Sequence, residues 1–332
     1  MSAGRLTPEA RAPLREDVRV KPQRRLARLG LIVLACLAAG GCGGGARAGR
    51  PLALGNPARL PARGSSHVVE IVMENAEYGE VIGNRAAPYI NALARRYGLA
   101  TASYAITHPS LPNYIALTSG TTGGLESDCT SCTVDAPNIV DQLEAAGISW
   151  KAYLEDLPTP CFKGASFAGY AKKHNPFAYY PDVAGDGARC AHLVGFAALA
   201  RNLRNGRLPT YAWISPNLCD DGHDCALGTA DRFLAELVPA LLAELGPHGF
   251  LILTWDEGSS DSGCCAGARG GQIATIVAGP DVRRGAREST PVDHYGTLAT
   301  VERALGLAPL AGAAAPAAGN LDGLFRRPPR LR

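Results

Sequence analysis

The chain has 332 residues, with 33 Lys and Arg against 30 Asp and Glu, 46% hydrophobic residues and 10 Cys. That length is enough for one large domain or two modest ones with a core that folds without help. Residues 1–41 hold 8 basic and 3 acidic residues, so the remainder carries 25 against 27 and is close to neutral. A near-neutral body excludes a general nucleic-acid binder, which would show a basic stripe. We therefore expect no nucleic-acid partner.

The first 41 residues predict an export signal. Arg24, Arg25 and Arg28 precede an apolar run of about 11 residues that ends in small residues, whereas a spanning helix needs about 20. Residues 42–65, rich in Gly, Ala, Arg and Pro, are typical of a flexible tether. Two processing routes remain open: a lipoprotein box ending at Cys42, or ordinary cleavage at the A-x-A sequence 46–48. We expect a cell-envelope lipoprotein or a periplasmic or secreted protein, with membrane contact only through lipid on Cys42.

Export also explains the cysteines. Eight cysteines follow Cys42, and an even set in an oxidising compartment predicts disulfides. The spacing at 129–132 is also seen in zinc and thioredoxin-like sites, but no second zinc-type pair follows it. Pairs close in sequence are therefore the expectation, with Cys264 and Cys265 unassigned: Cys129–Cys132, Cys161–Cys190 and Cys219–Cys225.

Strand-like and helix-like segments alternate along the body. In chain order we expect a strand at 67–73, a helix at 87–97, a strand at 99–106, helices at 113–119 and 139–146, a strand at 150–154, a helix at 196–203, a strand at 210–214, a helix at 230–245, strands at 250–255 and 272–278, and a helix at 295–305. Such alternation predicts an α/β fold with a parallel sheet between helices. Residues 66–308 form the expected catalytic domain, with loop-rich stretches at 120–135 and 155–190. Residues 309–332 are predicted to be an Ala/Pro/Arg-rich tail with little structure.

Polar clusters follow three of the expected strands: Glu74-Asn75, residues 217–224 and Asp256-Glu257. Ligands bind at the carboxyl ends of strands in open α/β sheets, so these clusters are expected to converge. Any one of them would also fit a helix cap or a solvated turn, but three converging groups of carboxylates favour a site for a hard or borderline metal ion.

Ser110 lies in a further polar segment, residues 107–114, which follows a strand and opens a helix. A serine at that position is most often an N-cap. A helix N-terminus also binds anions, and a hydroxyl beside a metal ion is an activated nucleophile towards phosphate.

Several of these motifs, in this order over residues 67–306, resemble the bacterial and fungal phosphoesterase family. They are Val72-Met73-Glu74-Asn75 with Tyr78, Ala87 to Asn91, His108 to Tyr114, Ile214 to Asn217, Cys219 to Cys225, Thr254 to Gly258 and Tyr295 to Leu298. That family contains acid phosphatases and phospholipases C and belongs to the alkaline phosphatase superfamily. The resemblance implies an alkaline-phosphatase-like three-layer sandwich with a mostly parallel sheet between helices.

The resemblance also implies roles for individual residues. Ser110 takes the nucleophile position, Asn113 lies near the phosphoryl oxygens, and His223 lies beside the site as a proton carrier. One or two divalent ions would be held by Glu74, Asn75, Asp256 and Glu257, where this chain has Asp-Glu in place of two Asp. Further candidates are His108, Asp221, Asp224 and the late histidine His294, whereas the remaining histidines are expected at the surface: His67, His174, His192 and His248.

Together these observations predict an exported metal-dependent phosphoesterase that hydrolyses small phosphate monoesters through a phosphoserine. A phospholipase C is the alternative within enzymes, although such members of the family are usually longer, with extra C-terminal domains. A surface-tethered binding protein on an inactive scaffold is the alternative outside enzymes, and the presence of Ser110 with both carboxylate clusters is evidence against it.

Overall fold

The computed structural model describes residues 65–265 and 267–331. The expected export signal, Cys42 and almost all of the tether lie outside the described residues. Within the described ranges, no helix is both long enough and apolar enough to cross a membrane.

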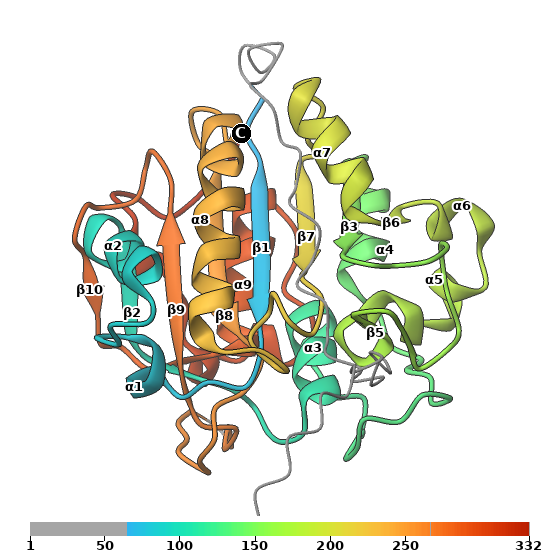
Figure 1. Cartoon of the computed structure of the whole chain (residues 1–332), viewed down its shortest axis with the longest axis horizontal. Coiled ribbons are helices and arrows are strands. Elements are labelled where there is room, and N and C mark those ends of the chain that lie inside the picture. The colour runs from blue at the N-terminus through green and yellow to red at the C-terminus, as the bar shows by residue number, and fades with distance from the viewer. Residues whose placement is uncertain (1–64, 266, 332) are drawn as a thin grey trace, which may run out of the picture. The chain divides into compact units, whose positions relative to one another are not determined.

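A nine-stranded, mostly parallel sheet forms the middle layer (Figure 1). The strand order is β10-β2-β9-β8-β1-β7-β3-β6, and β11 pairs with β2. Only β9 runs antiparallel, against both β8 and β2. The strands of this sheet are β1 (Val68–Met73), β2 (Gly98–Tyr104), β3 (Trp150–Leu154), β6 (Leu193–Val194), β7 (Tyr211–Ser215), β8 (Phe250–Trp255), β9 (Gln272–Ala278), β10 (Arg287–Glu288) and β11 (Val292–Asp293).

Helices cover both faces of the sheet, so the expected three-layer sandwich is confirmed. Figure 1 shows α8 in front of the sheet and α9 behind it. The helices that pack with α8 on one apolar core are α1 (Tyr78–Val81), α2 (Pro88–Arg96), α7 (Phe196–Arg204) and α8 (Leu227–Glu244). Those on the opposite core are α3 (Ser110–Ser119), α4 (Ile139–Ala145), α5 (Pro181–Ala184) and α9 (His294–Leu305).

The central strand β1 explains this layering. All six of its side chains are buried; Val68 and Val72 join one core, whereas Val69, Ile71 and Met73 join the other. A strand covered on both faces needs a nearly continuous apolar run, and this is what the sequence provides. The exception is Glu70, whose carboxylate accepts a hydrogen bond of 2.5 Å from the Tyr211 hydroxyl.

The loop-rich stretch at 155–190 contains short elements that the sequence did not predict. They are β4 (Ser166–Phe167), β5 (Tyr170–Ala171), the 3₁₀ turns η1 (Lys172–His174) and η2 (Pro176–Tyr179), α5, and α6 (Gly187–Cys190). Phe177, Tyr179 and Tyr180 are buried in the core, which fixes this stretch against α3. The helix expected at 113–119 begins earlier, at Ser110, because Pro112 is tolerated in a first helical turn.

The C-terminal segment differs from the expected tail. It forms the 3₁₀ turns η3 (Ala311–Ala314), η4 (Pro316–Ala318) and η5 (Asp322–Leu324). Leu321 and Leu324 are fully buried, and the Phe325 ring packs edge-on against Phe250 with the centroids 5.0 Å apart. The Ala- and Pro-rich composition of this segment thus gave no indication that Leu321, Leu324 and Phe325 are part of the core.

All three expected disulfides are present, at Cys129–Cys132, Cys161–Cys190 and Cys219–Cys225. The two unassigned cysteines, Cys264 and Cys265, form a fourth bond with each other.

Glu70 gives a testable pH dependence. Burial raises the pKa of Glu70 to about 8, although the Tyr211 hydrogen bond opposes this. The folded chain therefore holds a proton that the unfolded chain releases above the usual glutamate pKa, so stability falls as the pH rises from about 4.5 to about 8. Between pH 5 and pH 8 we expect the free energy of unfolding of Glu70→Gln to fall by roughly a few kcal/mol less than that of wild type. Urea unfolding of both proteins at the two pH values measures this difference. Other buried carboxyls titrate in both proteins, so equal losses in wild type and variant would contradict the assignment.

Candidate active site

The polar ends of β1, β7 and β8 meet at one edge of the sheet, as expected. The Glu74 amide donates to the carbonyl of Asp221 (3.1 Å), and the Asp256 amide donates to the carbonyl of Met73 (2.9 Å). These bonds join strand ends that are more than 140 residues apart in the sequence. Glu74, Asp221 and Asp256 are each at most 1% exposed.

Glu74 lies at the centre of the site. Its Oε2 accepts a hydrogen bond from the Ser110 hydroxyl (3.1 Å), and its Oε1 accepts one from the Tyr114 hydroxyl (2.5 Å). The His174 Nε2 lies 3.0 Å from the same Oε1. Although burial alone would raise it, the pKa of Glu74 is lowered to about 2 by the charge and contact of His174 and by Tyr114.

His174 connects two buried carboxylates. Its Nδ1 lies 3.2 Å from Asp221 Oδ2, and its ring stacks on Tyr114 with the centroids 5.2 Å apart. Burial would lower the pKa of His174, but the adjacent Glu74 and Asp221 raise it to about 10. The prediction that His174 lies at the surface is therefore wrong: η1 carries it into the site, where it is 2% exposed.

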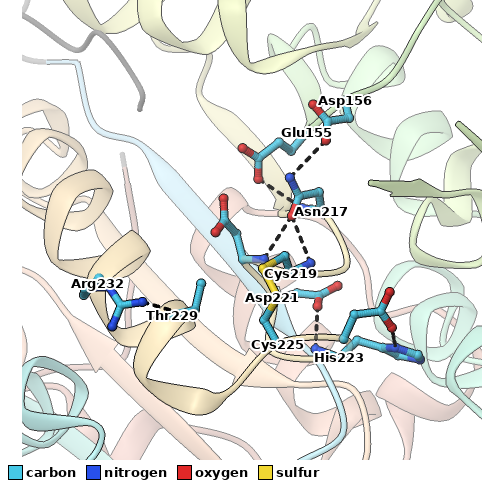
Figure 2. The surroundings of a disulfide bond; sticks show 11 residues. Glu155, Asp156, Asn217, Cys219, Asp221, His223, Cys225, Thr229 and Arg232 are labelled. Carbon is cyan, nitrogen blue, oxygen red and sulfur yellow. Dashed lines mark hydrogen bonds and ion pairs between the residues drawn. A yellow bond between two sulfur atoms is a disulfide. The ribbon is translucent and has the colours of Figure 1, made fainter. Parts of the chain in front are cut away.

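A disulfide-closed loop presents Asp221 and His223 to the site (Figure 2). The loop starts from Asn217, whose side-chain oxygen accepts from the amides of Cys219 (3.0 Å) and Asp220 (2.9 Å). The Asp221 carboxylate in turn accepts from the His223 amide (2.8 Å). The turn is thus held by side-chain acceptors as well as by the Cys219–Cys225 bond.

His223 lies beside the cluster. Its ring centroid is 5.9 Å from that of His174, and its Nδ1 contacts Asp224 Oδ1 at 2.7 Å. The Lys173 ammonium lies 3.3 Å from His223 Nε2 and 3.1 Å from Asp128 Oδ2. Lys173 therefore places a second cation next to His174, and the sequence analysis did not find it.

Ser110 is the first residue of α3 and is 1% exposed. Besides Glu74, its hydroxyl lies 3.5 Å from Glu257 Oε1, at the end of β8. The next amide, of Leu111, donates to Asp128 Oδ1 (2.9 Å), so a carboxylate already interacts with the positive end of this helix. The Ser110 hydroxyl accordingly points to the carboxylates and makes no N-capping bond.

Asn113 has a different role from the one expected. Its side-chain oxygen accepts from the amides of Ile106 (3.0 Å) and Thr107 (3.1 Å), and its amide nitrogen donates to the carbonyls of Thr107 (2.7 Å) and Pro109 (3.1 Å). An asparagine amide has two donors and two main acceptor positions, and all are engaged here. Asn113 positions the segment before Ser110 and has no hydrogen-bonding group left for a phosphoryl oxygen.

Two of the four predicted metal ligands, Glu74 and Glu257, contact the Ser110 hydroxyl, and the other two contact each other. Asp256 Oδ1 accepts from the Asn75 amide (3.0 Å), and Asn75 adopts a left-handed conformation at φ 48° that turns the chain away from β1. Burial and the charges of Glu74 and Glu257 raise the pKa of Asp256 well above its usual range. Glu257 Oε2 lies 2.6 Å from His108 Nδ1, so His108 contacts the site through this carboxylate.

His294 faces the backbone. Its Nε2 lies 2.6 Å from the carbonyl oxygen of Asp256, and burial lowers the pKa of His294 to about 4. The neutral His294 ring therefore stabilises the end of β8 through the contact between its Nε2 and this carbonyl oxygen. Of the other histidines, His248 is exposed as expected, whereas His67 is 6% exposed and binds the carbonyl of Pro209 (2.7 Å), and His192 is half-buried against Trp150.

The donor set fits a divalent cation, with the condition that His174 gives up the proton it holds between Glu74 and Asp221, because a metal-ligating imidazole is neutral. Glu74, His174 and Asp221 offer ligand atoms within 4.8 Å of one another. Within the described residues the buried Asp256 Oδ2 has no hydrogen-bond partner, whereas His174 Nε2 and Asp221 Oδ2 have the ion-pair contacts given above. Buried polar atoms are rarely left without a partner, and carboxylates in such numbers repel one another without a cation. A cavity of about 330 Å³ adjoins this cluster, lined by Glu74, Asn75, Asp221 and Trp255 among others.

Solved structures share this architecture. A protein of the alkaline phosphatase superfamily from Vibrio parahaemolyticus matches with a TM-score of 0.51 and 12% identity, over 77% of this chain and 71% of that one. The lipoteichoic acid synthase LtaP from Listeria monocytogenes matches with a TM-score of 0.53 and 10% identity, over 80% and 76%. At such identities the likeness concerns the fold, and the fold is that of the alkaline phosphatase superfamily.

The sequence comparisons are more specific. A model of the phosphoesterase family matches residues 83–308. The phosphatidylinositol-3-phosphatase of Mycobacterium tuberculosis is 33% identical over 246 residues, 73% of this chain and 77% of the relative. A probable acid phosphatase of Kluyveromyces lactis is 32% identical over 244 residues, and an acid phosphatase of Aspergillus fumigatus is 28% identical over 251. This chain covers 56% and 54% of those two fungal proteins. The chain belongs to the phosphoesterase family and is a hydrolase of phosphoric esters.

The position of His174 leads to a prediction about the site. His174→Gln leaves Glu74 and Asp221 buried without their cation, and removing one partner of a buried ion pair costs about 3–5 kcal/mol. We expect bound divalent metal to fall, measured by plasma mass spectrometry, and kcat/KM on an aryl phosphate to fall at least about 100-fold. The matched control His192→Gln alters a histidine that contacts Trp150 outside the site. If both variants keep their bound metal and their activity, the predicted role of His174 in metal binding and catalysis is wrong.

Proposed function

We propose that this chain is an exported phosphatase that uses a divalent metal ion to hydrolyse small phosphate monoesters through a phosphoserine on Ser110. The observation that carries the proposal is the Ser110 hydroxyl, placed at a helix N-terminus within 3.1 Å of Glu74 and 3.5 Å of Glu257. The names of the relatives, acid phosphatase and phosphatidylinositol-3-phosphatase, support monoesters over the diesters of a phospholipase C.

One or two ions would be held by Glu74, Asn75, Asp256 and Glu257, with His174 and Asp221 on the other side of Glu74. When bound, a divalent ion lowers the pKa of a serine hydroxyl and offsets the negative charge that a phosphate meets. Such an offset is needed because the carboxylates of the site outnumber the cations Lys173 and His174 in the described residues.

The residues of the chain then have separable tasks. The Ser110 proton passes to Glu257, whose pKa is raised by burial, and the oxygen attacks phosphorus in line with the ester bond. The bond from phosphorus to the leaving oxygen breaks, and that oxygen takes a proton from His223. Water then attacks the phosphoserine, giving its proton to His223, and inorganic phosphate leaves as Ser110 is reprotonated. Lys173, whose charge acts on Glu74 and Asp256, would offset part of the negative charge of the phosphoryl group in both steps.

Ser110→Ala tests the nucleophile. We expect turnover of an aryl phosphate to fall by several orders of magnitude, because the variant cannot form the covalent intermediate. Rapid acid quench with ³²P-labelled substrate, followed by peptide mapping, should place label on Ser110 of the wild type. Ser119→Ala is the matched control, since this buried hydroxyl on the same helix donates to the backbone carbonyls of Ile115 and Thr121 and contacts neither Glu74 nor Glu257, and it should keep most of the activity.

The other outcomes are equally clear. A fully active Ser110→Ala variant without label would mean that water attacks phosphorus directly. Turnover of a phosphodiester alone would indicate a phospholipase C type of activity. No turnover of either substrate in metal-loaded wild type would favour a binding protein on an inactive scaffold.

Export is tested separately. The arginines and the short apolar run before Cys42 motivate processing near residue 42 or residue 48. Mass spectrometry of the mature chain should find a lipid-modified Cys42 or a new N-terminus close to residue 49. An intact Met1 start recovered from the cytoplasm would contradict export.

A further inference from the structure

A cluster of arginines lies at the end of the sheet opposite to the active site. It comprises Arg283 and Arg284, in the turn after β9, and Arg326, Arg327 and Arg330, near the C-terminus; we call it the arginine face. Its two segments are joined by backbone bonds, from the Arg283 amide to the Leu324 carbonyl and from the Arg326 amide to the Asp281 carbonyl, both 2.9 Å. A bridge between Val282 and Phe325 fixes them side by side.

The five arginine side chains are exposed. Within the described residues, no carboxylate lies at ion-pair distance from any of them. Of the nearby acids, Asp281 pairs with His248 (2.8 Å) and Asp322 pairs with Arg303, whereas Glu288 accepts a hydrogen bond from Thr290 (2.7 Å) and interacts with the charge of Arg283 at a longer distance than an ion pair. A concave surface of about 550 Å³ lies between residues 325–330, His248 and Asp281. The positive charge of this face is therefore available to a partner.

The direction of the strands separates this face from the catalytic residues. Strand β1 runs from Val68 to Glu74 at its carboxyl end, and six residues of strand span about 20 Å. The chain enters β1 beside the arginine face, because the Ser66 hydroxyl accepts from the amide of His248 (3.2 Å), a residue of that concave surface. Figure 1 shows the C-terminus next to the start of β1. Residue 65, where the described chain begins, therefore lies at the same end of the sheet as the arginine face.

We infer that the arginine face binds an anionic membrane surface. Guanidinium groups form paired hydrogen bonds with phosphate, and basic clusters next to a membrane attachment point are held by anionic lipids. Phe167, the large hydrophobic side chain exposed in the described residues, lies in β4 and not on this face, so we expect the binding to be mainly electrostatic. The inference does not depend on the proposed chemistry. Its consequence for function is that the active site points away from the bilayer and receives its substrate from solution.

Vesicle binding tests the inference. The full chain carrying Cys42→Ser, which cannot be lipidated, is sedimented with vesicles of phosphatidylcholine alone or mixed with phosphatidylglycerol. The test variant replaces Arg283, Arg284, Arg326 and Arg327 by Gln. The matched control removes the same charge from exposed positions elsewhere, with Gln at Arg85, Lys163, Arg201 and Arg232.

We expect binding to the anionic vesicles only, and a loss of at least about 100-fold in partition coefficient for the test variant, since each arginine near the surface contributes about fivefold. Added salt should weaken the binding of wild type and control alike. Both variants should keep wild-type turnover of a soluble aryl phosphate, which shows that they are folded. Hydrogen exchange on vesicles should slow at 281–287 and 325–330 and remain unchanged around Ser110.

Three results would overturn the inference. They are equal binding to neutral and anionic vesicles, equal loss in test variant and control, and binding to heparin without binding to vesicles. The last would assign the arginine face to a soluble polyanion. The outcome is independent of the catalytic proposal, because the same assay run with Ser110→Ala should give the wild-type partition coefficient.

Discussion

Glu74 ends the central strand with a carboxylate that is closed off from solvent, and its two oxygens meet the hydroxyls of Ser110 and Tyr114 and the ring of His174. A buried carboxylate is costly unless positive charge and hydrogen bonds surround it. The elements around it supply these: α3 brings two hydroxyls, and η1 brings an imidazolium. The carboxyls of Asp256 and Glu257 at the end of β8 add to this requirement, because the charge of Glu74 raises the pKa of both. The arrangement of the site thus follows from the need to stabilise one charge.

Side chains away from the strand ends hold Ser110 in position. Asn113 uses its whole amide to hold residues 106–109, and Asp128 interacts with the first turn of α3 while also pairing with Lys173. The β8–β9 loop is organised in a similar way by Glu77, whose carboxylate accepts from the amides of Ser259 and Gln272. Side chains that satisfy backbone groups keep these loops rigid, and rigid loops keep a nucleophile within reach of its base.

The sequence was sufficient to predict the central sheet, because buried parallel strands appear as continuous apolar runs. It also predicted which residues lie at the strand ends, because each run changes abruptly to polar residues there. It was not sufficient for His174. That histidine lies in a stretch without periodicity, and only long-range packing of Phe177, Tyr179 and Tyr180 carries it inside; the three aromatic residues were the available signal. The role expected for Asn113 came from the family motif, and a motif does not reveal that the amide is engaged by the backbone of residues 106–109. The short turns after residue 309 were not predicted, because this segment is mostly alanine and proline and only a few of its side chains pack into the core.

The position of β1 has a practical consequence for work with fragments. The family match begins at residue 83, after β1, yet β1 pairs with both β7 and β8 in the middle of the sheet. A fragment trimmed to the matched span would lose Glu74 and, more seriously, would leave the facing edges of two long apolar strands unpaired. Open edges of that kind recruit strands from other molecules. Such a fragment would precipitate or form mixed oligomers, so its lack of activity would say nothing about the catalytic residues that it retains.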